Sequence, residues 1–419
     1  MEKVLNGIVR VSRRFNRTSV LVITERFYPE SFLINDLVQE WDAAGFDVRV
    51  LTQVPSYPID RVFSGYINQT SRSHEAGVHV TRIKTVTGYS RSLIRKIMSY
   101  LNFLARGTYQ VLRYHRTITH LFVYHTGPLT QAFPAALLKI LKPHVRTTIW
   151  TQDVWPDTVF AYGLSPYGAP AVILKFFVRL VYRFFDAVIV SSPGFSARLQ
   201  PYLPALKKPV FIPQWVPDAF ANAGGVTDLV FDQGKTKFIY TGNIGTMQNL
   251  FNVVAAFRSV VDDAHLYILG DGSKRAELSD YIAGNGVQNV HMLGPVPQSE
   301  VQSCIRQCDF AVLSLTPSDL INLTIPAKFQ AYLSAGRPIL CVANGEVRGL
   351  VENQDLGITA NPDNVGDISA KIGDAMHADI RTRQKWMENM RKLLTSAYSK
   401  ESSVKGITDI VYASVERQQ

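Results

Sequence analysis

Residues 237–249 read KFIYTGNIGTMQN, and this stretch decides the fold. The β-branched and aromatic run at 238–240 predicts a strand, and the small residues at 241–245 predict a sharp turn. Apolar residues then recur at the spacing of one helical face, at Leu250, Val253, Val254 and Phe257. Such a turn directs backbone N–H groups and the positive end of a helix toward one point, which suits a phosphate. Similar turns in other α/β proteins bind nothing, so the loop alone leaves both interpretations open.

A second unit of the same kind follows closely. Residues 265–269 (HLYIL) predict a strand, and Gly270-Asp271-Gly272 predicts the turn after it. Two successive strand–turn–helix units form half of a mononucleotide-binding sheet. The chain contains neither the G-x-G-x-x-G pattern of dinucleotide binding nor the G-x-x-x-x-G-K-[ST] pattern of a P-loop.

The same alternation runs through the whole chain of 419 residues, which is too long for one ordinary core. We expect a doubly wound α/β fold with domains at 18–213 and 214–395, a basic lead-in at 1–17, and a C-terminal helix at 396–419 that packs back on the first domain. The expected strands of the first domain are 19–24, 46–52, 78–83, 119–124, 146–150, 187–190 and 210–213. Those of the second are 238–240, 266–269, 290–292, 310–313, 339–342 and 357–359.

Charge is distributed unevenly along the chain. Residues 1–213 hold 26 Lys and Arg against 12 Asp and Glu, whereas residues 214–419 hold 18 against 22. No acidic residue occurs from Ala76 to Gln152, although eleven Lys and Arg do. A basic surface of this kind attracts nucleic acid, an anionic membrane or a phosphorylated substrate, and composition does not choose among them.

Two expected helices in this half are both apolar and basic, at about 91–116 and 171–186. Either they pack on the sheet with a solvated basic face, or they lie against a membrane surface. In the second helix Lys175, Arg179 and Arg183 share one stripe, so we expect its apolar part to pack inside and its basic edge to meet solvent or lipid head groups.

Other features narrow the class of protein. The three cysteines, Cys304, Cys308 and Cys341, imply no disulfide framework, and we expect buried thiols rather than a metal site. The sequence predicts neither a signal peptide nor a transmembrane helix. The turn at 151–157 (TQDVWPD) places Asp153 and Asp157 after an expected strand, where α/β sheets build their sites.

Together these motifs resemble glycosyltransferase family 4, which has the GT-B architecture. The matching stretches are FYPES and GFDVRVLTQVPSYP near the start, TQDVWPDT in the middle, VIVSSPGFSARL before the linker, YTGNIGTMQN and LGDG in the second half, and TIPAKFQAYLSAGRPI near the end. The details are most similar to bacterial O-antigen and capsule transferases of amino sugars such as N-acetyl-L-fucosamine.

The resemblance implies two Rossmann-like domains that face each other across a cleft. The second binds a nucleotide-sugar, most simply a UDP-sugar, and the first binds the acceptor. Family members retain the anomeric configuration and work without a metal, and this chain has no Asp-x-Asp motif. We therefore expect no cofactor, a polyprenyl-diphosphate-linked saccharide as acceptor, no nucleic acid partner, and a cytoplasmic location on the inner face of the plasma membrane.

The resemblance also indicates site residues. Asp153 and Lys328 are the expected catalytic residues, the lysine to stabilise the leaving diphosphate; each has an ordinary alternative, as a turn carboxylate and as a surface lysine. Donor binding is expected at Gly242, Asn243, Gly245, Gln248, Lys274, Asn322, Thr324, Pro326, Ala327 and Gln330. Acceptor binding is expected at Glu30, His125 and Asp157.

Three positions depart from the family pattern. Leu323 and Ala331 stand where members carry two glutamates, the second of which holds the ribose, and Gln152 stands where many carry histidine. Gln330 can hydrogen-bond a hydroxyl group in place of the second glutamate. Two alternatives to a transferase remain: a UDP-sugar 2-epimerase on the same fold, and a non-enzymatic protein that binds nucleic acid or membrane through its basic half.

Overall fold

The computed structural model describes residues 18–89, 92–114, 118–221, 225, 227, 229, 231–232 and 234–416. The expected lead-in at 1–17 lies outside this range. Contacts divide the chain into two compact units. The first contains the residues up to Ser191, Phe195–Ile212 and those from Val404 onward, and the second contains Ser192–Gly194 and Pro213–Ser403. The change of unit after Ile212 falls next to the expected domain boundary at 213.

The first unit is built on a sheet of eight strands in the order β3-β4-β2-β1-β5-β6-β7-β8. Every pair is parallel except β3 with β4. The strands are β1 (Ser19–Ile23), β2 (Asp47–Gln53), β3 (Ser71–Glu75), β4 (Val78–Ile83), β5 (His120–His125), β6 (Arg146–Thr151), β7 (Ala187–Val190) and β8 (Val210–Phe211). β1 and β5 are buried along their whole length, as expected for parallel strands covered on both faces.

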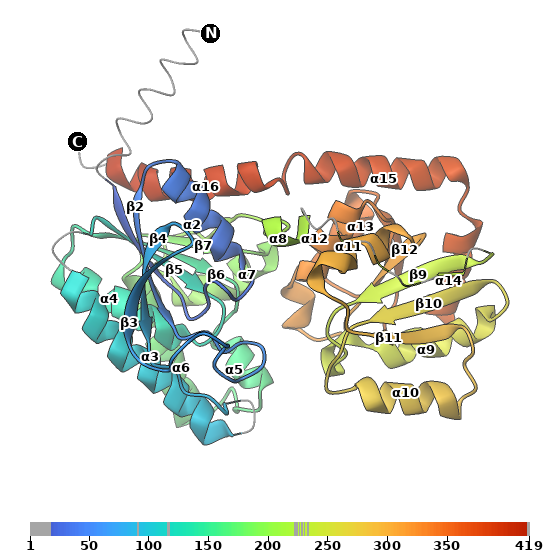
Figure 1. Cartoon of the computed structure of the whole chain (residues 1–419), viewed down its shortest axis with the longest axis horizontal. Coiled ribbons are helices and arrows are strands. Elements are labelled where there is room, and N and C mark those ends of the chain that lie inside the picture. Colours follow the sequence, from blue (N-terminus) through green and yellow to red (C-terminus); the bar gives the residue numbers. More distant parts are fainter. Residues whose placement is uncertain are drawn as a thin grey trace, which may run out of the picture. The chain divides into compact units, whose positions relative to one another are not determined.

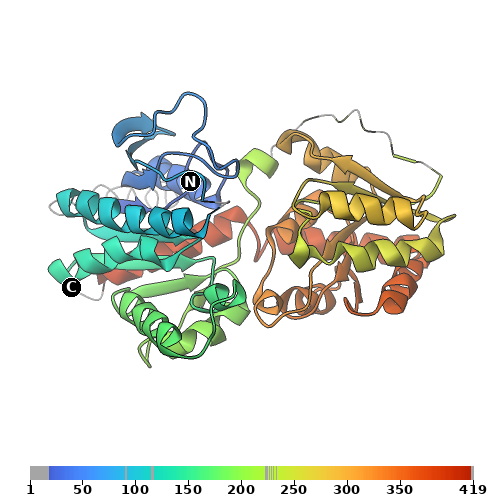
Figure 2. The same cartoon turned by 90° about the horizontal axis from the view of Figure 1, so that it is seen from below.

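Helices cover both faces of this sheet (Figure 1). They are α2 (Leu33–Ala43), α3 (Leu93–Tyr114), α4 (Phe133–Leu141), α5 (Asp157–Ala161), α6 (Ala169–Arg183) and α7 (Pro193–Leu199), with short 3₁₀ segments η1 (Leu129–Ala132) and η2 (Gln200–Tyr202). α3, α4 and α6 lie side by side on one face, as Figure 2 also shows. On the other face the Trp41 side chain of α2 packs edge-on against Phe122 of β5.

The C-terminal helix α16 (Lys400–Glu416) carries the chain back to the first unit, which it enters at Val404. The indole N–H of Trp41 donates to the Thr408 hydroxyl at 2.9 Å, which attaches α16 to α2. None of the helices in the described part of the chain is both long enough and apolar enough to cross a membrane.

The second unit is a doubly wound sheet of six parallel strands in the order β11-β10-β9-β12-β13-β14. The strands are β9 (Thr236–Thr241), β10 (Ala264–Leu269), β11 (Val290–Gly294), β12 (Phe310–Ser314), β13 (Ile339–Val342) and β14 (Gly357–Ala360). The helices are α8 (Asp218–Ala221), α9 (Leu250–Phe257), α10 (Arg275–Gly284), α11 (Gln298–Arg306), α12 (Ala327–Ala335), α13 (Glu346–Asn353), α14 (Val365–His377) and α15 (Ile380–Leu394), with η3 (Thr246–Gln248), η4 (Arg258–Val260) and η5 (Ile321–Leu323).

Each face of this sheet has its own hydrophobic core. One core contains residues of α9 and α14, and the other contains residues of α11, α12, α13 and α15. The three cysteines are reduced and buried in the second core, which confirms the prediction of buried thiols. Both sheets and their parallel order confirm the predicted α/β class.

Two local predictions were wrong. The polar segment Ser71–Glu75 was not predicted as a strand, but it pairs antiparallel with β4 as an edge strand; edge strands need no apolar alternation because one side faces solvent. In α6, apolar side chains were expected to pack inside, yet Val172, Ile173 and Phe176 are exposed. The exposed side of α6 is therefore apolar as well as basic.

Candidate functional site

The carboxyl ends of β9 and β10 carry two glycine turns that are bonded backbone to backbone. The Gly242 N–H donates to Leu269 O at 2.9 Å, and the Ile244 N–H donates to Asp271 O at 2.9 Å. The Lys274 N–H returns a bond to Ile244 O at 2.9 Å. These three bonds hold the β9 turn against the start of α10.

This contact requires glycine at two positions. Gly270 has φ +143°, and a Cβ there would lie 1.9 Å from Gly242 O. A Cβ on Gly272 would lie 2.3 Å from Ile244 O. Any side chain at either position would separate the two turns, because neither oxygen belongs to a flexible side chain.

The predicted loop residues come together around one side chain. Gln248 Oε1 accepts hydrogen bonds from the Gly245 N–H (3.0 Å) and from Asn243 Nδ2 (3.1 Å). The loop is thereby closed on itself before α9 begins. Gly242, Asn243, Gly245 and Gln248 form one compact turn, with Gly242 at φ +118°.

Lys328, in the first turn of α12, reaches the same loop. Its Nζ donates to the Tyr240 hydroxyl at 2.6 Å and lies 3.9 Å from the centre of that ring. The Tyr240 hydroxyl in turn donates to Asn243 O at 2.5 Å. Burial lowers the pKa of Lys328 to about 7. The structure therefore brings Lys328 and the β9 loop together, with Tyr240 between them.

Tyr332, one turn further along α12, fixes the helix to the sheet. Its hydroxyl accepts from the Thr241 N–H at 3.1 Å and donates to Val312 O at 3.0 Å. The start of α12 is thus held at the carboxyl ends of β9 and β12. Neither Tyr240 nor Tyr332 was predicted from the sequence as part of the site.

Two other residues that were expected to bind the nucleotide-sugar form contacts with neighbouring residues of the protein. The Gln330 side chain is buried, and its amide nitrogen donates to Pro326 O (2.9 Å) and Ala327 O (3.1 Å) when the amide is oriented by its neighbours. Gln330 therefore stabilises the start of α12, in place of the hydroxyl contact expected of it. Lys274 Nζ forms an ion pair of 2.5 Å with Glu277 in the next turn.

Asn322 and Thr324 lie in and after η5, just before Pro326. The Thr324 hydroxyl donates to Ile321 O at 2.7 Å, which closes this turn. The Asn322 backbone packs on Gly345, where a Cβ would lie 1.9 Å from Asn322 O. Leu323 and Ala331, which replace the family's glutamates, supply no carboxylate here; Ala331 O accepts from Gln302 Nε2 at 3.2 Å.

In the first unit Asp153 lies in the turn after β6. It accepts a short hydrogen bond from the Thr158 hydroxyl. Burial raises the pKa of Asp153 to about 6, although this hydrogen bond and the charge of Lys96 oppose the shift. The carboxyl group is thus poised to exchange a proton near neutral pH. Asp157, by contrast, forms an ion pair with Arg198 at 2.8 Å at the start of α5.

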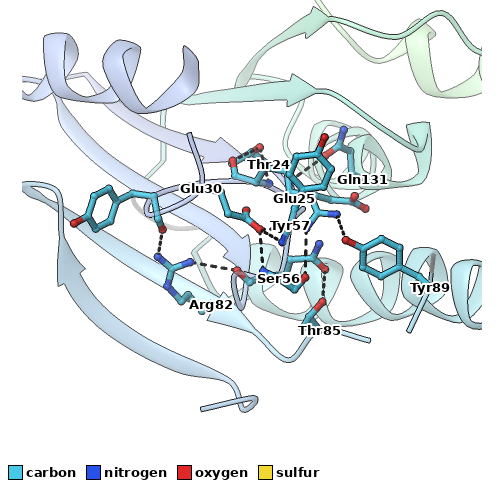
Figure 3. A network of polar contacts seen from close by, with 12 residues as sticks. Thr24, Glu25, Glu30, Ser56, Tyr57, Arg82, Thr85, Tyr89 and Gln131 are labelled. Carbon is cyan, nitrogen blue, oxygen red and sulfur yellow. Dashed lines mark hydrogen bonds and ion pairs between the residues drawn. The ribbon is translucent and has the colours of Figure 1, made fainter. Parts of the chain in front are cut away.

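The Glu30 side chain is buried and bonds to the backbone of a loop in the first unit (Figure 3). Its Oε1 accepts from the Ser56 N–H (2.9 Å) and the Tyr57 N–H (2.7 Å), and Arg26 lies 3.3 Å away. Only 1% of the Glu30 side chain is exposed. These bonds stabilise the segment that follows β2, so Glu30 acts within the fold.

His125, at the end of β5, is fully buried. Burial lowers its pKa to about 4. The ring is therefore neutral at pH 7 and shielded from water. A proton-transfer role at neutral pH does not fit this environment.

Sequence analysis missed the residues beside Glu30. Glu25 follows β1 and is buried, and burial raises its pKa to about 7. Arg26 lies over the rings of Tyr57 (5.0 Å) and Tyr89 (5.6 Å) and donates to the Tyr89 hydroxyl at 3.2 Å. An acidic residue directly after a buried strand was the available signal for Glu25.

Two family models match the chain, one for each unit. The model described as Glycosyl transferase 4-like domain matches residues 33–215, and the model described as Glycosyl transferases group 1 matches residues 227–393. The chain belongs to glycosyltransferase family 4. The first match begins after β1 and includes β2 to β8, and the second includes all six strands of the second unit.

Two curated proteins are similar to this glycosyltransferase. WcaI of Escherichia coli, a putative colanic acid biosynthesis glycosyl transferase, is 22% identical over 355 residues, which are 80% of this chain and 86% of WcaI. WbjE of Pseudomonas aeruginosa, a probable glycosyltransferase, is 21% identical over 238 residues, 55% of this chain. The match spans only 59% of the length of WbjE.

The fold of this glycosyltransferase is found in solved structures of the GT-B type. The structure of HepE from Anabaena in complex with UDP-glucose has a TM-score of 0.65 with 11% sequence identity. The match covers 94% of this chain and 99% of HepE. At this identity the likeness shows the fold alone, and it confirms the predicted architecture.

Proposed function

We propose that this glycosyltransferase transfers a hexose, with retention of configuration, from a UDP-sugar to a lipid-linked saccharide. The transferred sugar is an N-acetylated amino sugar, in the synthesis of a surface polysaccharide. The observation that carries the proposal is the position of Lys328, which is held 2.6 Å from Tyr240 beside the β9 loop. A cation, a glycine turn and the N-terminus of α12 converge there, as a diphosphate requires.

The leaving group dictates what these residues do. When the bond from the sugar to UDP breaks, negative charge develops on the diphosphate. Lys328 and the free N–H groups at the start of α12 offset this charge without a metal ion. In the described part of the chain, no three His, Cys, Asp or Glu side chains gather as metal ligands. Metal independence is part of the proposal.

Relatives support the donor and the process. HepE, which shares the fold, was crystallised with UDP-glucose, and WcaI is named for colanic acid biosynthesis. We extend the UDP donor of HepE to this chain, and likewise the role in polysaccharide biosynthesis for which WcaI is named. The amino-sugar assignment comes from the sequence resemblance.

Asp153 is the proposed group that orients the acceptor hydroxyl. Its partly buried carboxyl group lies at the carboxyl end of β6, where doubly wound sheets bind ligands. Retention follows if the acceptor attacks the face that the diphosphate leaves, with a phosphate oxygen receiving the hydroxyl proton. The acceptor hydroxyl loses its proton, the sugar–phosphate bond breaks, and a new glycosidic bond forms.

The surface of α3 and α6 supports a membrane-bound acceptor. Large apolar side chains are exposed in the first half of each helix: Leu93, Ile94, Ile97, Met98 and Leu101 in α3, and Val172, Ile173 and Phe176 in α6. Neither helix contains an acidic residue. We call these eight side chains the α3–α6 face and propose that it binds an anionic lipid surface, on the inner side of the cytoplasmic membrane.

The α5 segment connects the two helices of this face. Lys96 Nζ of α3 lies 4.7 Å from the Tyr162 ring, and Lys175 Nζ of α6 lies 5.5 Å from the Phe160 ring. Lys96 also acts electrostatically on Asp153. A saccharide on a membrane lipid would therefore arrive next to Asp153.

A panel of nucleotide-sugars tests the proposal. We expect UDP and UDP-sugars to raise the melting temperature of the protein, because a ligand that binds only the folded state stabilises it, whereas GDP- and dTDP-sugars do not. The UDP-sugar that stabilises is then incubated with membrane-extracted lipid-linked saccharides. Transfer supports the proposal, and a new product from UDP-sugar alone would identify an epimerase instead. Tighter binding to RNA than to anionic vesicles at physiological salt would contradict the membrane assignment.

A further inference from the structure

The first unit contains a buried carboxyl group that the proposed function does not yet use, that of Glu25. Glu25 follows β1, only 6% of it is exposed, and its Oε1 is buried with no hydrogen-bond partner among the described residues. The adjacent Arg26 directs its guanidinium to Glu30 and Tyr89 instead. A buried carboxyl oxygen without a partner destabilises the fold, since it has lost its hydration and gained nothing in return.

Glu25 lies over the turn that follows β5. A Cβ on Gly127 would lie 3.6 Å from Glu25 Oε2, so a larger residue there would touch the carboxyl group. The Glu25 N–H donates to Gln131 Oε1 at 3.1 Å, as Figure 3 shows. This bond fixes the backbone of Glu25 to the η1 segment and leaves its carboxyl group for another partner.

Further buried polar atoms lie in η1 itself. Gln131 is fully buried, and its Nε2 has no partner in the described structure. The same holds for the hydroxyl oxygen of Thr130. Acceptor and donor atoms without partners are thus gathered where β1 and β5 end. Groups of this kind match a ligand with many hydroxyl groups, each of which donates and accepts.

Tyr100 of α3 packs beside the Asp153 turn. Burial raises the pKa of Tyr100, and the negative charges of Glu25 and Asp153 add to the shift, so its hydroxyl is within electrostatic reach of both. Its ring also packs on Trp155, 6.5 Å between ring centres, in the Asp153 turn. The turn itself is bonded to β5 through the Gln152 N–H and His125 O, at 2.8 Å.

We propose that Glu25 binds a hydroxyl group of the acceptor sugar, and that Glu25, Gln131, Tyr100 and Asp153 form one hydroxyl-binding subsite. The inference rests on the proposed glycosyl transfer and names the side chains that hold its acceptor. The ligand class is a neutral sugar ring. An anionic group would be repelled by the two carboxylates. The subsite adjoins the α3–α6 face through Tyr100, which fits a sugar carried on a membrane lipid.

Binding of methyl glycosides tests this subsite directly. The probes are the methyl β-glycosides of glucose, galactose and N-acetylglucosamine, which lack a lipid chain and cannot be captured by the apolar α3–α6 face. Saturation-transfer NMR on the full chain reports which sugar protons contact the protein. We expect at least one glycoside to bind, and Glu25→Leu to weaken it by at least about tenfold, because leucine removes both oxygens that bond the sugar hydroxyl. Glu25→Gln, which keeps one acceptor, should have a smaller effect.

Two controls separate this inference from the proposed function. Asp42→Asn changes an exposed carboxyl group on α2 of the same unit and should leave glycoside binding unchanged. UDP should stabilise every variant equally, because its proposed site is in the second unit. If UDP stabilises the wild type but no glycoside binds, or if Glu25→Leu binds as well as the wild type, the subsite is wrong and the proposed function stands. If UDP stabilises nothing, the proposed function fails.

Discussion

Lys328 Nζ lies 2.6 Å from the Tyr240 hydroxyl and 3.9 Å from the centre of the Tyr240 ring. One residue of α12 thus contacts both the edge and the face of an aromatic side chain at the end of β9. Burial lowers the pKa of this lysine to about 7. Before substrate binds, the ammonium group is therefore only partly charged at neutral pH.

This relationship predicts proton uptake when UDP binds. A diphosphate next to Lys328 raises its pKa, so the affinity is full below about pH 7, where the free lysine is already charged, and it decreases as pH rises from there toward the pKa of the complex. At pH 8 binding should take up close to one proton. Calorimetric titration in buffers of different ionisation enthalpy measures this number. Lys328→Ala should abolish the uptake and lower turnover at least about tenfold, a change of ~1.4 kcal/mol in the barrier.

A lysine elsewhere in the second unit controls for general effects of charge. Lys385 on α15 pairs with Asp355 and is largely exposed. Lys385→Ala should bind UDP with the same proton uptake as the wild type. Equal turnover of Lys328→Ala and the wild type would remove Lys328 from the leaving-group role.

The contact between Gly270 and Gly242 predicts a second outcome. Gly270→Ala places a Cβ 1.9 Å from Gly242 O at a residue with φ +143°. The strain in such a backbone conformation is ~1–3 kcal/mol, and the clash adds to it. We expect a lower melting temperature and the loss of UDP stabilisation, because the two turns must separate. Thermal unfolding with and without UDP measures both.

Gly284 supplies the matched control for this glycine. It ends α10 in the same unit, and a Cβ there meets no atom within 4 Å. Gly284→Ala should bind UDP normally and stabilise the protein by ~0.5–1 kcal/mol, since alanine loses less conformational freedom in a helix. Normal UDP stabilisation in Gly270→Ala would show that close packing of the turns is not needed for donor binding.

The spacing of apolar residues along the sequence predicted most of the strands and helices of the fold. The runs at 19–24 and 238–240 correctly predicted β1 and β9, and the helical spacing after residue 249 correctly predicted α9. The antiparallel β3 was not predictable in this way, because its SRSHE sequence has no apolar alternation. The order of the strands within each sheet could not be predicted either, because it depends on how the chain crosses over between strands and not on local sequence.

The sequence predicted a candidate site from glycines and a lysine at fixed spacings, and the structure brings Lys328 next to the β9 loop. Tyr240 and Tyr332 were missed because a buried aromatic residue in a strand or helix reads as core, and only the structure shows what its hydroxyl contacts. Gln330 was expected to hydrogen-bond a hydroxyl group of the ligand. In the structure its amide nitrogen donates to backbone oxygens at the start of its own helix, as polar residues at this position can do. Glu30 was predicted in place of Glu25, and its Oε1 accepts hydrogen bonds from two backbone N–H groups of the loop after β2.

Glu25 predicts a dependence of stability on pH. Its pKa rises from 4.5 in the unfolded chain to about 7 in the folded protein, through burial and the charge of Glu30, against the charge of Arg26; Tyr100 of α3, which interacts with it, stays neutral in this range. Between these values the folded state holds more protons, so stability falls as pH rises. The full loss, ~3 kcal/mol at 1.36 kcal/mol per pKa unit, is reached above pH 7.

Glu25→Gln removes this titration. The variant should melt at the same temperature as the wild type near pH 4.5 and at a higher one at pH 8, as measured by calorimetry. Asp42→Asn, which changes an exposed carboxyl group of α2, is the control variant. If the difference in melting temperature between Glu25→Gln and the wild type is the same at both pH values, Glu25 is not a desolvated carboxyl group.

The exposed side chains of α6 predict how the protein meets lipid. Phe176 is 65% exposed at the centre of a helix without acidic residues. Burying a phenylalanine in an apolar environment contributes ~1.5–3 kcal/mol, so Phe176→Glu should weaken binding to phosphatidylglycerol-containing vesicles at least about tenfold. Ile380→Glu is the control, because Ile380 is 74% exposed on α15 of the second unit, outside the α3–α6 face. Vesicle flotation measures both variants against the wild type.

The charge of the surrounding Lys and Arg side chains should also contribute to binding, and salt screens this contribution. Binding should therefore weaken when salt is added, and it should be weaker to vesicles made of phosphatidylcholine alone. If Phe176→Glu floats with the vesicles as well as Ile380→Glu does, the α3–α6 face does not enter the lipid, and a protein partner becomes its occupant.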